Sequence, residues 1–263
     1  MPLSRRAVNS LSVALLCLSM TAGASAQSTA DLMQRADKGD AKAMFDLGAH
    51  YAAGDGVPQD YTKAADWWRK GAEQRDADAE FALGALYESG SGVPQDYGKA
   101  AALYRKSAEQ GHADAEYGLA SLYYEGLGVP QDHAQAAVWY RKAAEQGDAD
   151  AEFYLGLSYF SGLGVPQDDA QAAFWYRKAA EQNDAKAQHG LGLLYRSGLG
   201  VPKDYVEAYF WLDLAAAGKQ ETAEQRDVAA SMRDSIEKML TPADLSQVQE
   251  RARKWFETHP KIH

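Results

Sequence analysis

The most constraining feature of the chain is the peptide Gly-Val-Pro-Gln-Asp, which returns at a fixed interval. Five copies, the last with Lys203 in place of Gln, place their prolines 36 residues apart, at Pro58, Pro94, Pro130, Pro166 and Pro202. A period that holds over five copies without an insertion or deletion indicates that one supersecondary unit is stacked on the next. The pattern predicts five units, at residues 40–75, 76–111, 112–147, 148–183 and 184–219.

Each unit reads as two short helices separated by a turn. In the fourth unit, small and apolar residues recur at steps of four and three, which places them on one side of a first helix. Asp148 is expected to cap its start and Gly162 to end it. Pro166 lacks a backbone donor and so separates the helices. The second helix is expected to bury the aromatic column Trp67, Leu103, Trp139, Trp175 and Trp211 together with Ala172, Tyr176, Ala179 and Ala180.

These landmarks resemble the Sel1-like repeat family, a relative of the tetratricopeptide repeats. Units of that family also run A-x-x-x-L-G-x-x-Y-x-x-G-x-G-V-x-x-D-x-x-K-A-x-x-W-Y-x-x-A-A. The match spans residues 40–219 and departs from the pattern at His112, which replaces the opening Asp. The resemblance implies an all-α fold, a right-handed α-solenoid of stacked antiparallel helix pairs. It also implies a non-enzymatic scaffold for protein complexes, in bacteria often in the cell envelope.

The two ends of the chain do not follow the repeat. Residues 1–26 have the pattern of a secretory signal peptide, with Arg5 and Arg6 before an apolar stretch and a small-residue cleavage site before Gln27. Residues 27–39 are expected to form an N-terminal half-cap helix. Residues 220–263 are expected to form capping helices at about 221–240 and 242–257. The mature protein is therefore expected to be periplasmic or secreted, without stable membrane insertion after cleavage.

Charge and motif content argue against several classes of function. The chain has 27 basic and 37 acidic residues, and loss of the two signal arginines leaves a net charge near −12, which disfavours nucleic acid and anionic lipid. The histidines lack metal-ligand spacing, and no cofactor motif is found, so neither a metal nor a cofactor is expected. Two alternatives to a scaffold stay open. Ser235 and Lys238 fit the Ser-x-x-Lys of a beta-lactamase-like hydrolase of the cell wall, and a regulator could bind the periplasmic domain of a membrane sensor.

Positions that vary between units are the candidates for binding, because a protein or peptide partner from the envelope is not itself periodic. In the first helices these variable positions give an acidic end in the first two units and an apolar, aromatic end in units three to five. The groove is predicted to be lined by Asp46, Glu88, Tyr124, Tyr154, Leu157, Phe160, Leu193 and Arg196. Such a groove suits a peptide or helix with apolar anchors and a basic flank.

Overall fold

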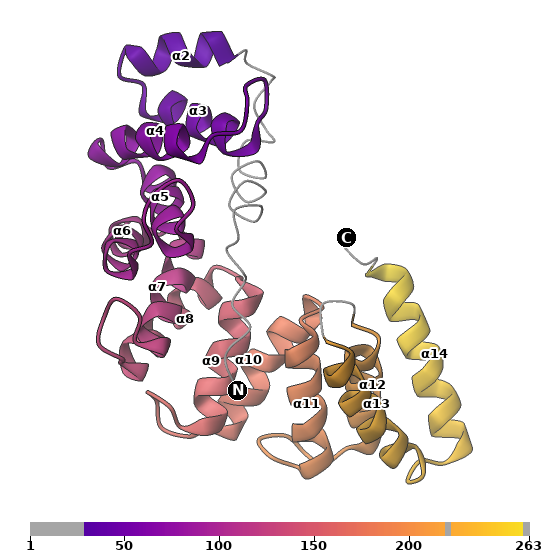
Figure 1. Ribbon diagram of the computed structural model, residues 1–263. Helices are drawn as coiled ribbons and strands as arrows, with labels where there is room; N and C mark the ends of the chain where they lie inside the picture. The colour runs from indigo at the N-terminus through magenta and orange to yellow at the C-terminus, as the bar shows by residue number, and fades with distance from the viewer. Residues whose placement is uncertain (1–28, 219–221, 260–263) are drawn as a thin grey trace. The chain divides into compact units, whose positions relative to one another are not determined.

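The computed structural model describes residues 29–218 and 222–259, and within them the chain forms thirteen helices and no strand (Figure 1). The all-α prediction is confirmed. The first helices of the five units are α3 (Ala41–Ala53), α5 (Ala77–Ser89), α7 (Ala113–Glu125), α9 (Ala149–Ser161) and α11 (Ala185–Ser197). The second helices are α4 (Tyr61–Glu73), α6 (Tyr97–Glu109), α8 (His133–Glu145), α10 (Asp169–Glu181) and α12 (Tyr205–Ala216). The flanking helices are α2 (Thr29–Asp37), α13 (Ala223–Glu237) and α14 (Pro242–Thr258). The signal-peptide prediction lies outside the described residues.

The chain divides into two compact parts, and the boundary falls inside α8, between Trp139 and Tyr140. In the N-terminal part, α2 packs on α3, and each helix from α3 to α7 packs on the next. In the C-terminal part, α9 to α12 form the same succession, and both α13 and α14 pack on α12. Each pair is therefore stabilised by its neighbour, as expected when a single helix pair cannot enclose its own apolar surface.

Helix starts and ends are fixed by side chains at repeat spacing. Asp148 caps α9, because its side chain accepts a hydrogen bond from the backbone N–H of Ala151, and Gly162 ends the helix with φ at 71°. Both predictions are confirmed. His112, which replaces the opening Asp in the third unit, caps α7 in the same way, with Nδ1 accepting from the N–H of Ala115 at 3.3 Å.

The Gly-Val-Pro-Gln-Asp turn is tied at both ends. Gln95 Nε2 donates to the carbonyl oxygen of Glu88 at 2.8 Å, which holds the turn against the helix just completed. Asp96 then caps the next helix by accepting from the N–H of Lys99 at 3.0 Å. The turn also contacts the preceding unit, because a Cβ on Gly92 would lie 2.4 Å from the backbone carbonyl carbon of Tyr61. Only glycine fits there, both for this reason and because its φ is 68°.

The predicted burial of the second helices is confirmed in part, and the aromatic column that is buried in every unit lies one residue after the predicted one. The predicted column is buried at Trp175 and Trp211 but only half-buried at Trp67, Leu103 and Trp139. The following position is buried in all five units, at Trp68, Tyr104, Tyr140, Tyr176 and Leu212. One step along a helix turns a side chain by about 100°, which directs this second column toward the first helices.

Candidate functional site

Two of the predicted groove residues are buried and cannot form a contact surface. Tyr154 is 3% exposed, and its ring stacks on Tyr140 with centroids 5.2 Å apart. Asp46 is 7% exposed, and burial raises the pKa of its carboxyl group above the ordinary value. These two assignments to the groove are corrected: both side chains belong to the interior.

The column of Tyr154 faces an aromatic ring of the preceding unit. At the equivalent positions stand Gly118 and Gly190, where an added Cβ would lie 3.0 Å from the ring of Tyr104 or Tyr176. Each of those tyrosines comes from the second helix of the preceding unit. The size of the facing ring does not explain the change from glycine to tyrosine, because that ring is a tyrosine in all three units, but the position is packed against the preceding unit in each of them.

Glu88 and Tyr124 are half-buried and already engaged within the N-terminal part. Glu88 accepts a hydrogen bond from the hydroxyl of Tyr104 at 2.6 Å. Burial, helped by Glu88, raises the pKa of the Tyr104 phenol well above its ordinary value, so the hydroxyl stays a donor. The ring of Tyr124 meets that of His133 edge-on, with centroids 4.9 Å apart.

The other four predicted residues lie at the surface of the C-terminal part. Leu157 and Phe160 on α9 are matched 36 residues later by Leu193 and Arg196 on α11. Phe160 is 39% exposed and the other three are half-buried, with Leu157 packed against the core. We refer to these four residues as the α9–α11 surface.

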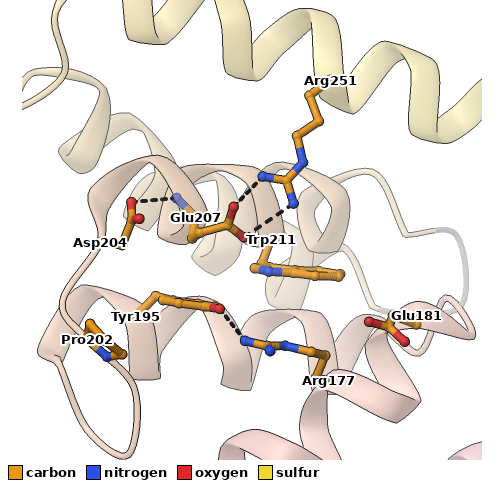
Figure 2. Close-up of a pocket in the computed structure, with 8 residues that line it drawn as sticks. All are labelled: Arg177, Glu181, Tyr195, Pro202, Asp204, Glu207, Trp211 and Arg251. Atoms are coloured by element: carbon orange, nitrogen blue, oxygen red, sulfur yellow. Dashed lines mark hydrogen bonds and ion pairs between the residues drawn. The ribbon is translucent and has the colours of Figure 1, made fainter.

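Sequence reasoning missed a cleft of about 480 Å³ in the C-terminal part (Figure 2). It lies between α10, the end of α11, the following turn, α12 and α14, and is lined by Arg177, Glu181, Tyr195, Pro202, Asp204, Glu207, Trp211 and Arg251. Most of these residues stand in repeat columns, and those columns carry no sign of a cleft. Arg251 lies beyond the last unit, so no repeat spacing could have connected it with the others.

The polar groups of the cleft are arranged in pairs (Figure 2). A guanidinium N–H of Arg177 donates to the hydroxyl oxygen of Tyr195, and Arg251 donates to both carboxylate oxygens of Glu207. Burial raises the pKa of the Tyr195 phenol above its ordinary value, while Arg177 opposes that shift. Tyr195 is therefore a neutral phenol near pH 7, with its own O–H still able to donate.

The remaining chemical candidates have ordinary surroundings. Ser235 lies exposed near the end of α13, where its hydroxyl donates to the carbonyl oxygen of Met232 at 2.6 Å, a local helix contact. Nothing in that geometry prepares Ser235 as a nucleophile for Lys238 to activate. Over residues 29–218 and 222–259, no group of three or more His, Cys, Asp or Glu side chains could hold a metal ion. In the same ranges, no helix has the length and apolarity needed to cross a bilayer.

The chain resembles several solved structures, including the following two. A Sel1 repeat protein from Oxalobacter formigenes is 35% identical, with a TM-score of 0.70 over 82% of this chain and 87% of that one. The protein c5321, a protective antigen present in uropathogenic Escherichia coli strains and displaying an SLR fold, is 33% identical with a TM-score of 0.58. That match covers 95% of this chain but 62% of c5321. Comparison with curated proteins gave no match.

The family model described as Sel1 repeat matches most of the chain, at residues 41–76, 77–112, 113–148, 149–184, 185–219 and 240–258. The sixth match covers the whole of α14, which the fixed period had left outside the repeats. Pro242 and Asp244 at its start have the same spacing as Pro58 and Asp60 in the first unit. On the strength of five complete matches and this partial one, the chain belongs to the Sel1 repeat family.

Proposed function

We propose that the protein is exported and acts as an adaptor that binds proteins of the cell envelope through the α9–α11 surface. Sel1 repeat proteins are in general scaffolds for protein interaction and are generally not enzymes. The observation that carries the proposal is that Phe160 keeps a large apolar side chain exposed on α9, in a column where the first two units have Ala52 and Glu88. Phe160 and Leu157 correspond to Glu88 and Ala85 in the second unit.

The chemistry of this surface suits a peptide or helix with apolar anchors. Large apolar side chains supply most of the affinity of protein interfaces when a partner covers them, and polar neighbours at the rim exclude water. Phe160 offers such an anchor, and Arg196 supplies a charged group in the equivalent position one repeat later. The basic flank expected from the sequence depended on Asp46, which is buried, and on Glu88, which is bonded to Tyr104. The proposed partner segment therefore combines an aliphatic or aromatic side chain with an acidic flank at the Arg196 side.

Export is supported by the sequence of residues 1–26 and by one relative. The protein c5321 is a protective antigen, and antibodies reach a bacterial antigen most readily outside the cytoplasm. Intact-mass measurement of the exported protein tests the proposal directly. A chain that begins at Gln27 is the expected product, whereas a mass that retains residues 1–26 would contradict it.

Binding is best tested with two variants, in each of which a photo-crosslinking amino acid replaces a different exposed phenylalanine. Phe160 on α9 and Phe174 on α10 are both exposed, but only Phe160 belongs to the α9–α11 surface, so Phe174 is a matched control. A discrete adduct with an envelope protein is expected from position 160 and not from position 174. Phe160→Ser should then abolish co-purification of that protein, while Phe174→Ser leaves it intact.

The identity of the adduct separates the two kinds of binding protein considered from the sequence. A structural envelope protein supports the adaptor, and a sensor's periplasmic domain supports the regulator. Equal adducts from both positions would place binding elsewhere on the chain.

A further inference from the structure

Two buried indole donors in the C-terminal part, those of Trp175 and Trp211, have no partner within the described residues, and Trp211 lines the cleft. Trp211 is 4% exposed, and its indole Nε1 is buried without a hydrogen bond. Burying a polar group without a partner is costly, so such groups in proteins are uncommon and call for a cause. Two other tryptophans show the usual arrangement: Trp68 Nε1 donates to the carbonyl oxygen of Phe45, and Trp255 Nε1 donates to Asn183 Oδ1, each at 3.0 Å.

The unpartnered indole N–H lies in the wall of the cleft. Figure 2 shows the ring of Trp211 between Glu207 and Arg177, with its nitrogen edge on the side where Tyr195 lies. Three residues that line the same space carry donors: the buried indole N–H of Trp211, the phenol O–H of Tyr195 and the guanidinium of Arg177. Arg177 is exposed on its own helix and holds Tyr195 by one of its N–H groups.

The acidic groups of the cleft are largely occupied. Glu207 is paired with Arg251, and Asp204 caps α12 by accepting from the N–H of Val206 at 2.8 Å and of Glu207 at 3.0 Å. Glu181 is the remaining carboxylate, and Figure 2 shows it beyond the stem of Arg177, on the side away from Tyr195. Three of the lining residues are acidic and two are basic, so it is the donors of Trp211, Tyr195 and Arg177, and not the net charge of the cleft, that favour an anionic group in this space.

We propose that this cleft binds the carboxylate group of a peptide, with one oxygen accepting from the indole N–H of Trp211 and the other paired with Arg177. A guanidinium matches the planar geometry of a carboxylate, and charge-assisted hydrogen bonds are the strong ones. A volume of about 480 Å³ holds a few residues of peptide. The site is separate from the α9–α11 surface and does not depend on the proposed envelope partner.

The site at Trp211 has a counterpart in the preceding unit. One unit earlier, Trp175 is also buried with an unpartnered Nε1, and Arg141 donates to the hydroxyl of Tyr159. Gln171 stands there in place of Glu207, so the acidic partner that holds Arg251 in place is missing. The ion pair between Glu207 and Arg251 is what distinguishes the site at Trp211.

The indole N–H signals of the mature protein test the proposal by ¹H–¹⁵N NMR. Trp211→Phe assigns the signal of Trp211. The probes are N-acetyl-glycyl-glycine as the free acid, its C-terminal amide, and N-acetyl-aspartate amide, all titrated at pH 7. N-acetyl-glycyl-glycine as the free acid, N-acetyl-aspartate amide, or both should shift the Trp211 signal saturably. The C-terminal amide of N-acetyl-glycyl-glycine, which has no carboxylate, should not shift it. The signal of Trp68, whose N–H is bonded internally, is the control and should stay in place.

Substitutions at two exposed positions sharpen the test. Arg177→Gln should weaken binding about tenfold or more, because a charge-assisted hydrogen bond is lost. Glu181→Gln should strengthen it by removing a like charge. A response to the free acid alone identifies a C-terminal carboxylate, and a response to the aspartate probe identifies an acidic side chain.

The proposal is overturned if no probe shifts the Trp211 signal, or if the C-terminal amide of N-acetyl-glycyl-glycine shifts it as strongly as the two probes that carry a carboxylate. It also fails if Arg177→Gln leaves the affinity unchanged, or if Trp175 responds and Trp211 does not.

Discussion

Replacing Trp68 with alanine is expected to be far more destabilising than the same change at its neighbour Trp67. Trp68 is fully buried, and its indole N–H donates to the carbonyl oxygen of Phe45. Truncation of a buried tryptophan costs about 3–5 kcal/mol, and loss of the hydrogen bond adds about 1 kcal/mol, giving about 4–6 kcal/mol. Trp67 is half-buried, with the ammonium of Lys70 3.8 Å from its ring centroid. Its truncation should cost about 2 kcal/mol, because roughly half of the burial is at stake.

Guanidinium chloride unfolding followed by circular dichroism at 222 nm measures both free energies of unfolding. Trp68→Phe is the informative companion, because it keeps most of the apolar volume and should cost about 1–2 kcal/mol even if the alanine variant fails to fold. The slope with denaturant should stay constant across the series, so that the differences report stability. An equal or larger loss for Trp67→Ala would refute the assignment of the inner column.

Three further changes test the packing inside the repeats. Gly48→Ala should destabilise the fold, because the added Cβ would lie 2.3 Å from Trp68 Nε1. Combining it with Trp68→Leu should recover part of the lost stability. If denaturant unfolding shows that the two losses simply add, the contact is contradicted. Glu80→Gln should raise the free energy of unfolding at pH 7 but not near pH 4. Burial raises the pKa of Glu80, so the protonated carboxyl group stabilises the fold at low pH. This contribution is lost as the pH rises through the raised pKa. Urea unfolding at the two pH values checks the sign, and a gain of the same size at both would be inconsistent with it. Tyr154→Ser should cost about 3 kcal/mol by removing its stack on Tyr140, and a melting curve like that of the parent protein would return Tyr154 to the surface.

Local features could be predicted from the sequence because they depend on neighbours within one unit. Asp148 and Gly162 were placed correctly as helix caps, since capping needs only a side chain and the backbone three or four residues away. The aromatic position that is buried in all five units was predicted only in part. Burial of Tyr176 was expected, but the predicted column runs through Trp139, which is half-buried, whereas the rotation of the helix turns Tyr140 inward.

Features that depend on contacts between units could not be predicted in the same way. Variation at the position of Tyr154 could mark either a surface for a partner protein or a position packed against the neighbouring unit, and only the contact with Tyr140 decides between them. The cleft near Trp211 needed Arg251, which stands outside the repeat period, and a buried N–H whose lack of a partner is visible only in three dimensions.

The turn between the two helices of a unit has a consequence for how such genes change length. Gly92 touches the start of the preceding unit's second helix at Tyr61, and Gln95 is bonded back to Glu88, so the turn has contacts to keep on both sides. Adding or removing a single codon there would break one contact or the other. Gain or loss of a whole unit restores every contact at once. Recombination between copies in register is therefore the tolerated route, and paralogues and strain variants are expected to differ in steps of 36 codons.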